Sequence, residues 1–345
     1  MIRKNIQNLK PYVCARDLYQ SGIFLDANEN SFGSVLNDYK SLKINRYPDP
    51  YATDFKKALS KYLKISSKYI FCGVGSDELI DLIFKIYLDL NNNIIINKPT
   101  YGMYQVVADI NNINTKNVLL DDNFDIDLQA INNQVDKKTK IIIACSPNNP
   151  TGNLLSKKKI LKLCQKYTKK IVLLDEAYIE FSSQASLIQM VKKYPNLIII
   201  RTLSKAWGLA GLRLGYAVAN PGVILALNKV KAPYNINSIS QYLGTKALKN
   251  KKQMSSFKKV IIKERNKLIN ELKKINIPVF KSETNFLLIQ VKCATEIYNK
   301  LAKKYGIIIR NRTDEPKLNN CLRITIGTPE QNKKLIKALT NILNI

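Results

Sequence analysis

Histidine is absent from this sequence of 345 residues. The Ser-His-Asp and Cys-His arrangements of nucleophilic catalysis both need an imidazole, so neither can operate here. The six cysteines are scattered, and no two of them form a C-x-x-C pair. We therefore expect neither a metal site nor a disulfide framework. Acid–base chemistry must then fall to lysine, tyrosine, cysteine or a carboxylate.

Long apolar runs are missing as well. No run approaches the roughly 20 residues that a membrane-spanning helix needs, so we expect no membrane partner. The first residues, MIRKNIQNLKPYVCARD, lack the apolar core and the cleavage-like site of a secretory signal. Scattered, unpaired cysteines are typical of a reducing compartment, and we expect a cytoplasmic protein.

Acidic residues are scarce relative to basic ones. The chain has 26 Asp and Glu against 55 Lys and Arg, which gives a formal net charge of +29. Such a charge would suit nucleic-acid binding. The lysines, however, recur at helix-like spacing in 156–170 and 249–267, as on solvated helix faces, and no basic motif interleaved with aromatic residues is present. We expect no specific nucleic-acid binding.

Short apolar runs recur along the first two thirds of the chain, and amphipathic segments separate many of them. We interpret seven of these runs as strands: 69–73, 93–97, 117–120, 140–146, 171–176, 196–200 and 214–220. Most are continuously apolar, as expected for strands that are buried on both faces of a parallel sheet. Strands that alternate with helices predict an α/β fold with a mostly parallel, seven-stranded sheet between helices.

The pattern changes after about residue 235. One or two long helices come first, and short strands then alternate with helices up to the end of the chain. We predict a large ligand-binding domain over residues 45–235, an N-terminal arm over 1–44, and a small α+β domain over 236–345.

The segment GVGSDE, residues 73–78, follows a predicted strand and opens an amphipathic helix. Glycines followed by Ser76 and Asp77 at a helix start present backbone N–H groups to an anion. The segment matches neither a Walker loop nor the complete dinucleotide fingerprint. By itself it is equally compatible with an ordinary helix cap and with a phosphate site.

Two further motifs lie at the ends of predicted strands. CSPNNPTG, residues 145–152, projects Asn149 into the crevice where open α/β sheets bind ligands. VLLDEAY, residues 172–178, ends a buried strand on Asp175, with Tyr178 three residues later. A buried carboxylate needs a cationic or N–H partner. This partner could be a protonated pyridine nitrogen, or the carboxylate could form a structural salt bridge or cap a helix.

RTLSKAWGLAGLRLGY, residues 201–216, places a lysine among apolar residues. A lysine in a partly apolar pocket loses its proton more readily and becomes an amine nucleophile suited to a Schiff base. Ser204 precedes Lys205, and Arg213 can hold a phosphate through its guanidinium group. A phosphate cup, polar side chains for a ring and an amine for a covalent bond together suit pyridoxal 5'-phosphate.

With these motifs the chain resembles the fold-type I pyridoxal phosphate-dependent aminotransferases along essentially its whole length. The motifs SPNNPTG, DEAY and TLSKA…GLRLGY, in this order, carry the resemblance to the superfamily. LDANEN, RYPDP and SETNF…CLRIT point to its histidinol-phosphate branch. The resemblance implies pyridoxal 5'-phosphate as the cofactor and a homodimer as the assembly.

The resemblance also implies roles for the residues of these motifs. Lys205 would bond the cofactor covalently and move a proton during catalysis, and Asp175 would keep the pyridine nitrogen protonated. Tyr178 and Asn149 would hydrogen-bond the ring oxygen. The other cofactor contacts implied are ring stacking by Tyr101, phosphate binding by Ser76, Asp77, Ser204 and Arg213, and a phosphate contact from Tyr47 to the neighbouring subunit. Trp207 departs from the family pattern, and we expect it to change the pocket wall.

The same resemblance suggests the substrates. Arg323 in CLRIT would bind the carboxylate of glutamate or 2-oxoglutarate, and the dianionic phosphate of histidinol phosphate favours Arg310 as a second cation. Tyr12, Glu29 and Asn149 would line the substrate pocket.

The implied reaction converts L-histidinol phosphate and 2-oxoglutarate to imidazole-acetol phosphate and L-glutamate, in histidine biosynthesis. The alternatives are an aromatic or broad-specificity amino-acid aminotransferase and a phospho-amino-acid decarboxylase on the same fold. A DNA-binding regulator of this fold would need a helix-turn-helix domain, for which no residues remain.

Overall fold

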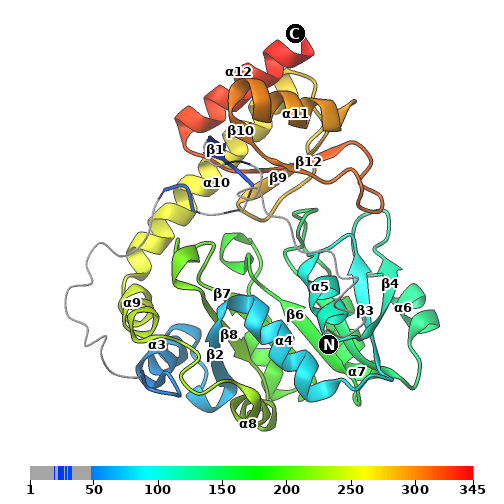
Figure 1. Ribbon diagram of the computed structural model, residues 1–345, viewed down its shortest axis with the longest axis vertical. Coiled ribbons are helices and arrows are strands. Elements are labelled where there is room, and N and C mark those ends of the chain that lie inside the picture. Colours follow the sequence, from blue (N-terminus) through cyan, green and yellow to red (C-terminus); the bar gives the residue numbers. More distant parts are fainter. Residues whose placement is uncertain (1–18, 20–21, 27, 29, 33–47, 345) are drawn as a thin grey trace, which may run out of the picture.

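The computed structural model describes residues 19, 22–26, 28, 30–32 and 48–344. Figure 1 shows a large sheet with helices around it in the lower part of the view and a smaller α+β part above it. The long helix α10 (Lys251–Lys274) runs from one part to the other.

The large sheet has seven strands in the order β2-β8-β7-β6-β5-β3-β4. Neighbouring strands are parallel except at β8, which is antiparallel to both β2 and β7. The strands are β2 (Ile70–Val74), β3 (Asn93–Lys98), β4 (Asn114–Leu119), β5 (Thr139–Cys145), β6 (Ile171–Asp175), β7 (Leu197–Thr202) and β8 (Leu214–Val218). The predicted seven-stranded, mostly parallel sheet is confirmed.

The continuously apolar strands are explained by burial on both faces. In β6, Val172 and Leu174 join one hydrophobic cluster, whereas Ile171 and Leu173 join another on the opposite face. Successive side chains of a strand point to opposite faces, so each face of this sheet needs its own apolar set.

Helices cover both faces of the sheet. One cluster contains residues of α4 (Gly75–Tyr87), α5 (Met103–Ile110) and α8 (Pro221–Val230). The other contains residues of α3 (Thr53–Leu63), α6 (Leu128–Gln134), α7 (Lys157–Lys166), α9 (Ser238–Lys249) and α10. Short 3-10 turns lie at η1 (Ser67–Tyr69), η2 (Ile179–Phe181), η3 (Ile188–Lys192) and η4 (Ala210–Leu212).

The smaller part is built on a three-stranded antiparallel sheet in the order β11-β12-β9. A second pairing joins β1 (Ile23–Phe24) to β10 (Ile307–Ile308). The remaining elements are β9 (Phe286–Gln290), α11 (Ala294–Tyr305), β11 (Arg310–Asn311), β12 (Cys321–Thr325) and α12 (Pro329–Leu343). Helix α12 begins with a capping box on Thr328 and a proline in its first turn, a combination that favours this start.

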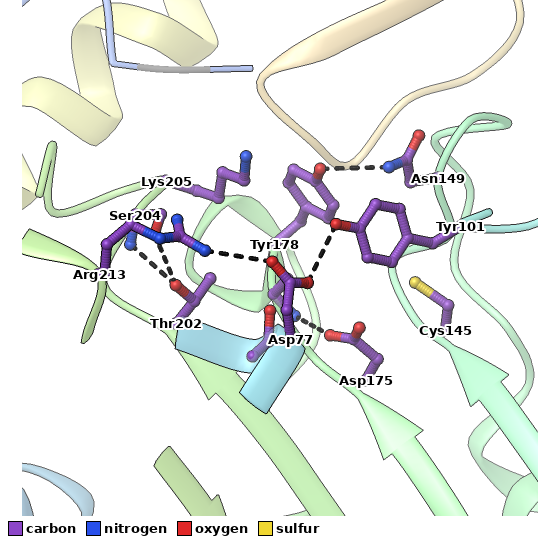
Figure 2. Close-up of a pocket in the computed structure, with 12 residues that line it drawn as sticks. Asp77, Tyr101, Cys145, Asn149, Asp175, Tyr178, Thr202, Ser204, Lys205 and Arg213 are labelled. Carbon is purple, nitrogen blue, oxygen red and sulfur yellow. Dashed lines mark hydrogen bonds and ion pairs between the residues drawn. The ribbon is translucent and has the colours of Figure 1, made fainter. Parts of the chain in front are cut away.

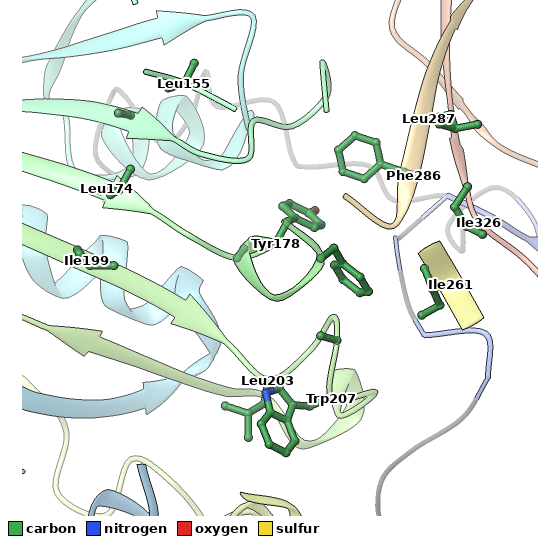
Figure 3. Close-up of a cluster of buried hydrophobic side chains, with 14 of the residues drawn as sticks. Leu155, Leu174, Tyr178, Ile199, Leu203, Trp207, Ile261, Phe286, Leu287 and Ile326 are labelled. Atoms are coloured by element: carbon green, nitrogen blue, oxygen red, sulfur yellow. The ribbon is translucent and has the colours of Figure 1, made fainter. Parts of the chain in front are cut away.

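The hydrophobic core is continuous between the two parts. Figure 3 follows it from Leu174 and Ile199 of the large sheet, past Tyr178, to Phe286 and Leu287 of β9. The rings of Tyr178 and Phe286 meet edge to face, with their centroids 5.2 Å apart. This shared core holds the small sheet against the end of the large one. None of the described helices is both long enough and apolar enough to cross a membrane.

Candidate active site

A pocket lies beside the carboxyl ends of β5, β6 and β7, and its empty space, with the open solvent at its mouth included, is about 490 Å³. Its lining residues are Ser76, Asp77, Tyr101, Cys145, Asn149, Asp175, Ala177, Tyr178, Thr202, Ser204, Lys205 and Arg213. Figure 2 shows how these side chains converge from loops that are far apart in the sequence. Nine of the predicted cofactor residues therefore line one pocket, which is where an open α/β sheet binds ligands.

The start of α4 and the start of β8 approach each other closely. Gly75 has a φ of 73°, and a Cβ atom at this position would lie 2.8 Å from Nη2 of Arg213. A Cβ atom on Gly215 would lie 2.4 Å from the carbonyl carbon of Gly75. Only glycines fit at both positions, and together they let the first backbone N–H groups of α4 lie next to a guanidinium group.

Asp77 connects two sides of the pocket. Its carboxylate accepts a hydrogen bond from Tyr101 Oη over 3.2 Å and forms an ion pair with Arg213, whose Nη2 lies 3.1 Å away. Both Asp77 and Arg213 are partly exposed at the mouth of the pocket. Tyr101, on the loop after β3, is thereby held against the start of α4.

Lys205 follows directly on a buried hydroxyl cluster at the end of β7. The Ser204 N–H donates to Thr202 Oγ1 over 3.1 Å, and the two hydroxyl oxygens lie 2.8 Å apart. Lys205 is only half-buried, and its Nζ lies 5.9 Å from the centroid of the Tyr178 ring. The hydroxyl cluster fixes the backbone from which the lysine extends into the pocket.

Asp175 ends β6 and is almost completely buried, with 2% of its surface exposed. Its Oδ1 accepts from the Ala177 N–H over 2.9 Å, and its Oδ2 accepts from Tyr104 Oη over 2.8 Å. Burial raises the pKa of Asp175 to about 6, although both hydrogen bonds oppose the shift. Asp175 takes part in none of the ion pairs found among the described residues. These residues therefore do not support a structural ion pair as the role of Asp175.

The Tyr178 hydroxyl is held by two amides. Asn28 Nδ2 donates to it over 3.0 Å and Asn149 Nδ2 over 3.4 Å. Asn149 Oδ1 in turn accepts from Arg323 Nη1 over 2.5 Å. Burial is the main cause that raises the pKa of Tyr178, to about 12, so the phenol keeps its proton near neutral pH.

The two predicted substrate arginines lie on adjacent strands of the small sheet. Arg310 of β11 pairs directly with Arg323 of β12, so both side chains leave the sheet on the same face. Arg323 is 4% exposed, and Arg310 is more accessible. Neither lines the pocket itself, but Arg323 reaches its wall through Asn149. Predictions for Tyr12, Glu29 and Tyr47 fall outside the described residues.

Trp207 does not line the pocket, contrary to our expectation. It is buried beneath the lysine loop, and its ring meets Tyr62 of α3 edge to face at 5.2 Å. The large indole is 1% exposed and belongs to the main hydrophobic cluster. Its side chain therefore contributes to packing under the loop.

Four residues around the pocket were not predicted from the sequence: Cys145, Ala177, Thr202 and Tyr104. Cys145, Ala177 and Thr202 lie inside the motifs CSPNNPTG, VLLDEAY and RTLSKAWGLAGLRLGY, and this position within a motif was the available signal. Tyr104 lies on a helix with an ordinary apolar face, so no local pattern distinguished it.

The residues of this pocket fit pyridoxal 5'-phosphate. The close approaches at Gly75 and Gly215 leave the first N–H groups of α4 beside Arg213. N–H groups next to a guanidinium group suit a dianionic phosphate. Asp175 is a buried carboxylate that can face a protonated ring nitrogen. Lys205 lines the same pocket, beside Tyr178.

The model of the aminotransferase class I and II family matches residues 22–339. The histidinol-phosphate aminotransferase of Parabacteroides distasonis is 42% identical over 347 residues, covering 99% of this chain and 98% of the relative. That of Christiangramia forsetii is 44% identical, covering 100% of this chain and 97% of the relative.

Solved structures agree with these relatives. The histidinol-phosphate aminotransferase of Sinorhizobium meliloti in complex with pyridoxal-5'-phosphate superposes with a TM-score of 0.92 at 25% identity, covering 99% of this chain and 97% of that one. The enzyme of Clostridium acetobutylicum gives 0.86 at 29% identity, covering 93% of this chain and 99% of that one.

Proposed function

The chain belongs to the aminotransferase class I and II family, and from this premise we propose that it transaminates L-histidinol phosphate with 2-oxoglutarate. The products are imidazole-acetol phosphate and L-glutamate, and the reaction is a step of histidine biosynthesis. The observation that carries the substrate is the identity of 42% and 44%, over nearly the full length, to relatives named histidinol-phosphate aminotransferase. The pocket supports the reaction type.

Pyridoxal 5'-phosphate, when bound, supplies an electron-withdrawing ring that stabilises negative charge on the substrate carbon next to the nitrogen. Asp175 would hold the ring nitrogen protonated, and Tyr178 with Asn149 would hydrogen-bond the ring oxygen. Lys205 Nζ would bond the cofactor and afterwards move the proton to and from the reacting carbon.

The phosphate of the cofactor would be held by Arg213, Ser204 and the first N–H groups of α4, at Ser76 and Asp77. Asp77 accepts from both Arg213 and Tyr101. The same carboxylate therefore orients the cation and the aromatic ring that would lie over the cofactor.

Substrate anions would bind to the arginines of the small sheet. Arg323 is already held by Asn149 and by the carbonyl of Asp26 over 2.6 Å, so its guanidinium is oriented before a substrate arrives. Arg310 beside it would add the second positive charge that a phosphate monoester favours. We assign Tyr12 and Glu29 to the substrate pocket on the family resemblance alone.

The assembly that we propose is a homodimer, with Tyr47 reaching the cofactor phosphate of the second subunit. An apolar surface near this segment supports the proposal: Tyr51, Val230, Tyr234 and Ile239 are each at least 40% exposed. Lys231 Nζ lies 6.0 Å from the Tyr51 ring centroid, so the 230–239 segment lies beside Tyr51. Exposed apolar residues gathered in this way mark protein interfaces.

Two further proposals concern the chain as a whole. We divide it into a large domain over 45–235 and a small one over 236–345, with the arm 1–44, because the seven-stranded sheet lies within 70–218 and the three-stranded sheet within 286–325.

We place the reaction in the cytoplasm, because the six cysteines suit a reducing compartment.

Substrate profiling tests the proposed function. The purified chain with pyridoxal phosphate should form glutamate from histidinol phosphate and 2-oxoglutarate, with a kcat/KM about 100-fold above that for phenylalanine. Release of carbon dioxide from O-phosphothreonine would instead indicate a decarboxylase; a decarboxylase of this substrate shares the fold at 24% identity. No glutamate formation from histidinol phosphate would overturn the proposal.

A further inference from the structure

Tyr104 is a buried residue next to the pocket that the proposed reaction does not yet use. Its side chain is fully buried, and its hydroxyl donates over 2.8 Å to Oδ2 of Asp175. Tyr104 belongs to α5, which covers the same face of the sheet as α4 and α8, whereas Asp175 ends the inner strand β6. The contact therefore joins a covering helix to the carboxylate that would face the cofactor ring.

The surroundings of Asp175 make this hydrogen bond important for its charge. Burial disfavours the ionised carboxylate, and the negative charges of Asp77 and Glu176 act in the same direction. The donors that oppose them are Tyr104 Oη and the Ala177 N–H. The titratable groups near Asp175 include Tyr104 on α5, Cys145 on β5, Asp77 on α4, and Glu176 and Tyr178 on its own loop. The cations Lys205 and Arg213 line the same pocket.

We propose that Tyr104 is a positioning residue of the cofactor site, whose hydroxyl keeps the Asp175 carboxylate ionised and oriented toward the ring nitrogen of pyridoxal phosphate. Oδ1 is held by the backbone and Oδ2 by the phenol, so the carboxyl group cannot rotate without losing both donors. A carboxylate has about four lone-pair directions, and two of them stay available to the cofactor.

The phenol is suited to this role at every working pH. Burial, together with the charge of Asp175, raises the pKa of Tyr104 well above its usual value, so the hydroxyl remains a donor. The Tyr104 ring also meets Tyr101 edge to face at 5.6 Å. Tyr104 thereby contacts both the carboxylate that would face the ring nitrogen and the tyrosine that would stack on the ring.

The inference rests on the proposed cofactor chemistry, but its first test needs no cofactor and no turnover. An unfolded aspartate titrates near 3.9, and folded Asp175 has a pKa of about 6. Between these values the folded chain binds more protons than the unfolded one, so the full chain freed of cofactor loses stability as the pH rises from about 4 to 6. Tyr104→Phe removes the donor, raises the pKa of Asp175 by about one pH unit, and extends this loss to about pH 7.

Denaturant unfolding at pH 5 and pH 8 therefore separates the hydroxyl from the packing of the ring. Relative to the unsubstituted chain, Tyr104→Phe should raise the unfolding constant about tenfold more at pH 8 than at pH 5. Tyr194→Phe is the matched control, because Tyr194 is also buried and its hydroxyl contacts only Gln165 among the described residues, over 3.1 Å. Its effect should be the same at both pH values. An effect of Tyr104→Phe that is equally independent of pH would overturn the proposal.

A second measurement reads the cofactor site by titrating the full chain with pyridoxal phosphate at pH 8. Tyr104→Phe should weaken binding about tenfold in the unsubstituted background and less than about twofold when Asp175→Asn is already present, because the two groups act through one interaction. Equal weakening in both backgrounds would show that Tyr104 acts independently of Asp175. Failure of either test would leave the transamination of histidinol phosphate unaffected as a proposal.

Discussion

Arg323 donates a hydrogen bond from Nη1 to Oδ1 of Asn149 over 2.5 Å, and this bond joins the small sheet to the loop after β5. The amide nitrogen of the same asparagine donates to the Tyr178 hydroxyl over 3.4 Å. A chain of three side chains therefore connects the arginine proposed to bind substrate anions with the tyrosine proposed to contact the cofactor ring. Binding at one end can affect the other through Asn149.

Replacement of Arg323 by lysine tests the forked geometry of the guanidinium group. Lysine keeps the positive charge, but it cannot contact Asn149 and the Asp26 carbonyl together with a substrate anion. We expect KM to rise about 10- to 100-fold for both glutamate and histidinol phosphate, the range that corresponds to one lost charged hydrogen bond. Steady-state kinetics with each substrate measures the change in KM. An unchanged KM for both substrates would show that Arg323 does not bind them.

Arg310→Gln distinguishes the two substrates from each other. If Arg310 serves the phosphate as a second cation, KM for histidinol phosphate rises about tenfold, whereas KM for glutamate changes less than about twofold. The same kinetic assay provides both values. Equal changes for the two substrates would mean that Arg310 acts on the sheet as a whole, since it pairs directly with Arg323.

Lys205→Ala should abolish turnover while the chain stays folded. The lysine is half-buried and lies beside Tyr178, so its removal leaves little core volume empty. We expect kcat to fall by at least about 1000-fold, and the visible absorption of covalently bound cofactor to be absent. Lys158→Ala, at an exposed position of α7, is the control that should change neither quantity. Normal cycling of the cofactor by the Lys205 variant would contradict the assignment.

Gly215→Ala should disturb the phosphate end of the pocket. The new Cβ atom would lie 2.4 Å from the Gly75 carbonyl carbon and 2.8 Å from the Ser76 nitrogen, so the start of α4 must move. We expect a loss of about 1–3 kcal/mol in the free energy of unfolding and weaker binding of pyridoxal phosphate. Gly211→Ala is the matched control, because that Cβ atom would meet no atom within 4 Å. Similar losses in both variants would exclude the contact as the cause.

The buried ion pair between Glu180 and Arg201 ties the turn after Tyr178 to β7, just before Lys205. Both side chains are at least 94% buried, so Glu180→Gln leaves an unpaired guanidinium group in the core and should cost about 3–5 kcal/mol of unfolding free energy. Glu296→Gln breaks the exposed pair with Lys300 and should cost at most about 1 kcal/mol. Denaturant unfolding measures both. A loss for Glu180→Gln as small as for Glu296→Gln would show that water reaches the pair.

Local patterns in the sequence predicted the strands and the motif loops well. Each apolar run became a strand. The inner strands of the large sheet are buried on both faces, whereas β4 at its edge is mostly exposed. Each motif loop follows a strand or opens a helix. The position of Trp207 was wrong in prediction, because the direction of a side chain depends on which neighbours leave space for it. The Trp207 ring packs against Tyr62 of α3, and no pattern near residue 207 indicates this contact.

By itself the sequence determined that no histidine side chain takes part in catalysis and that a mostly parallel sheet forms. It also showed that a lysine, an aspartate and an arginine occur in motifs suited to one cofactor. Only the tertiary structure decided that Tyr104 holds Asp175 and that Asn149 joins Arg323 to Tyr178. Hydrophobic periodicity and turn residues act over a few neighbouring positions, so the sequence displays them directly. These hydrogen bonds join residues 71, 174 and 29 positions apart, and they depend on how the helices and the small sheet pack against the strand ends.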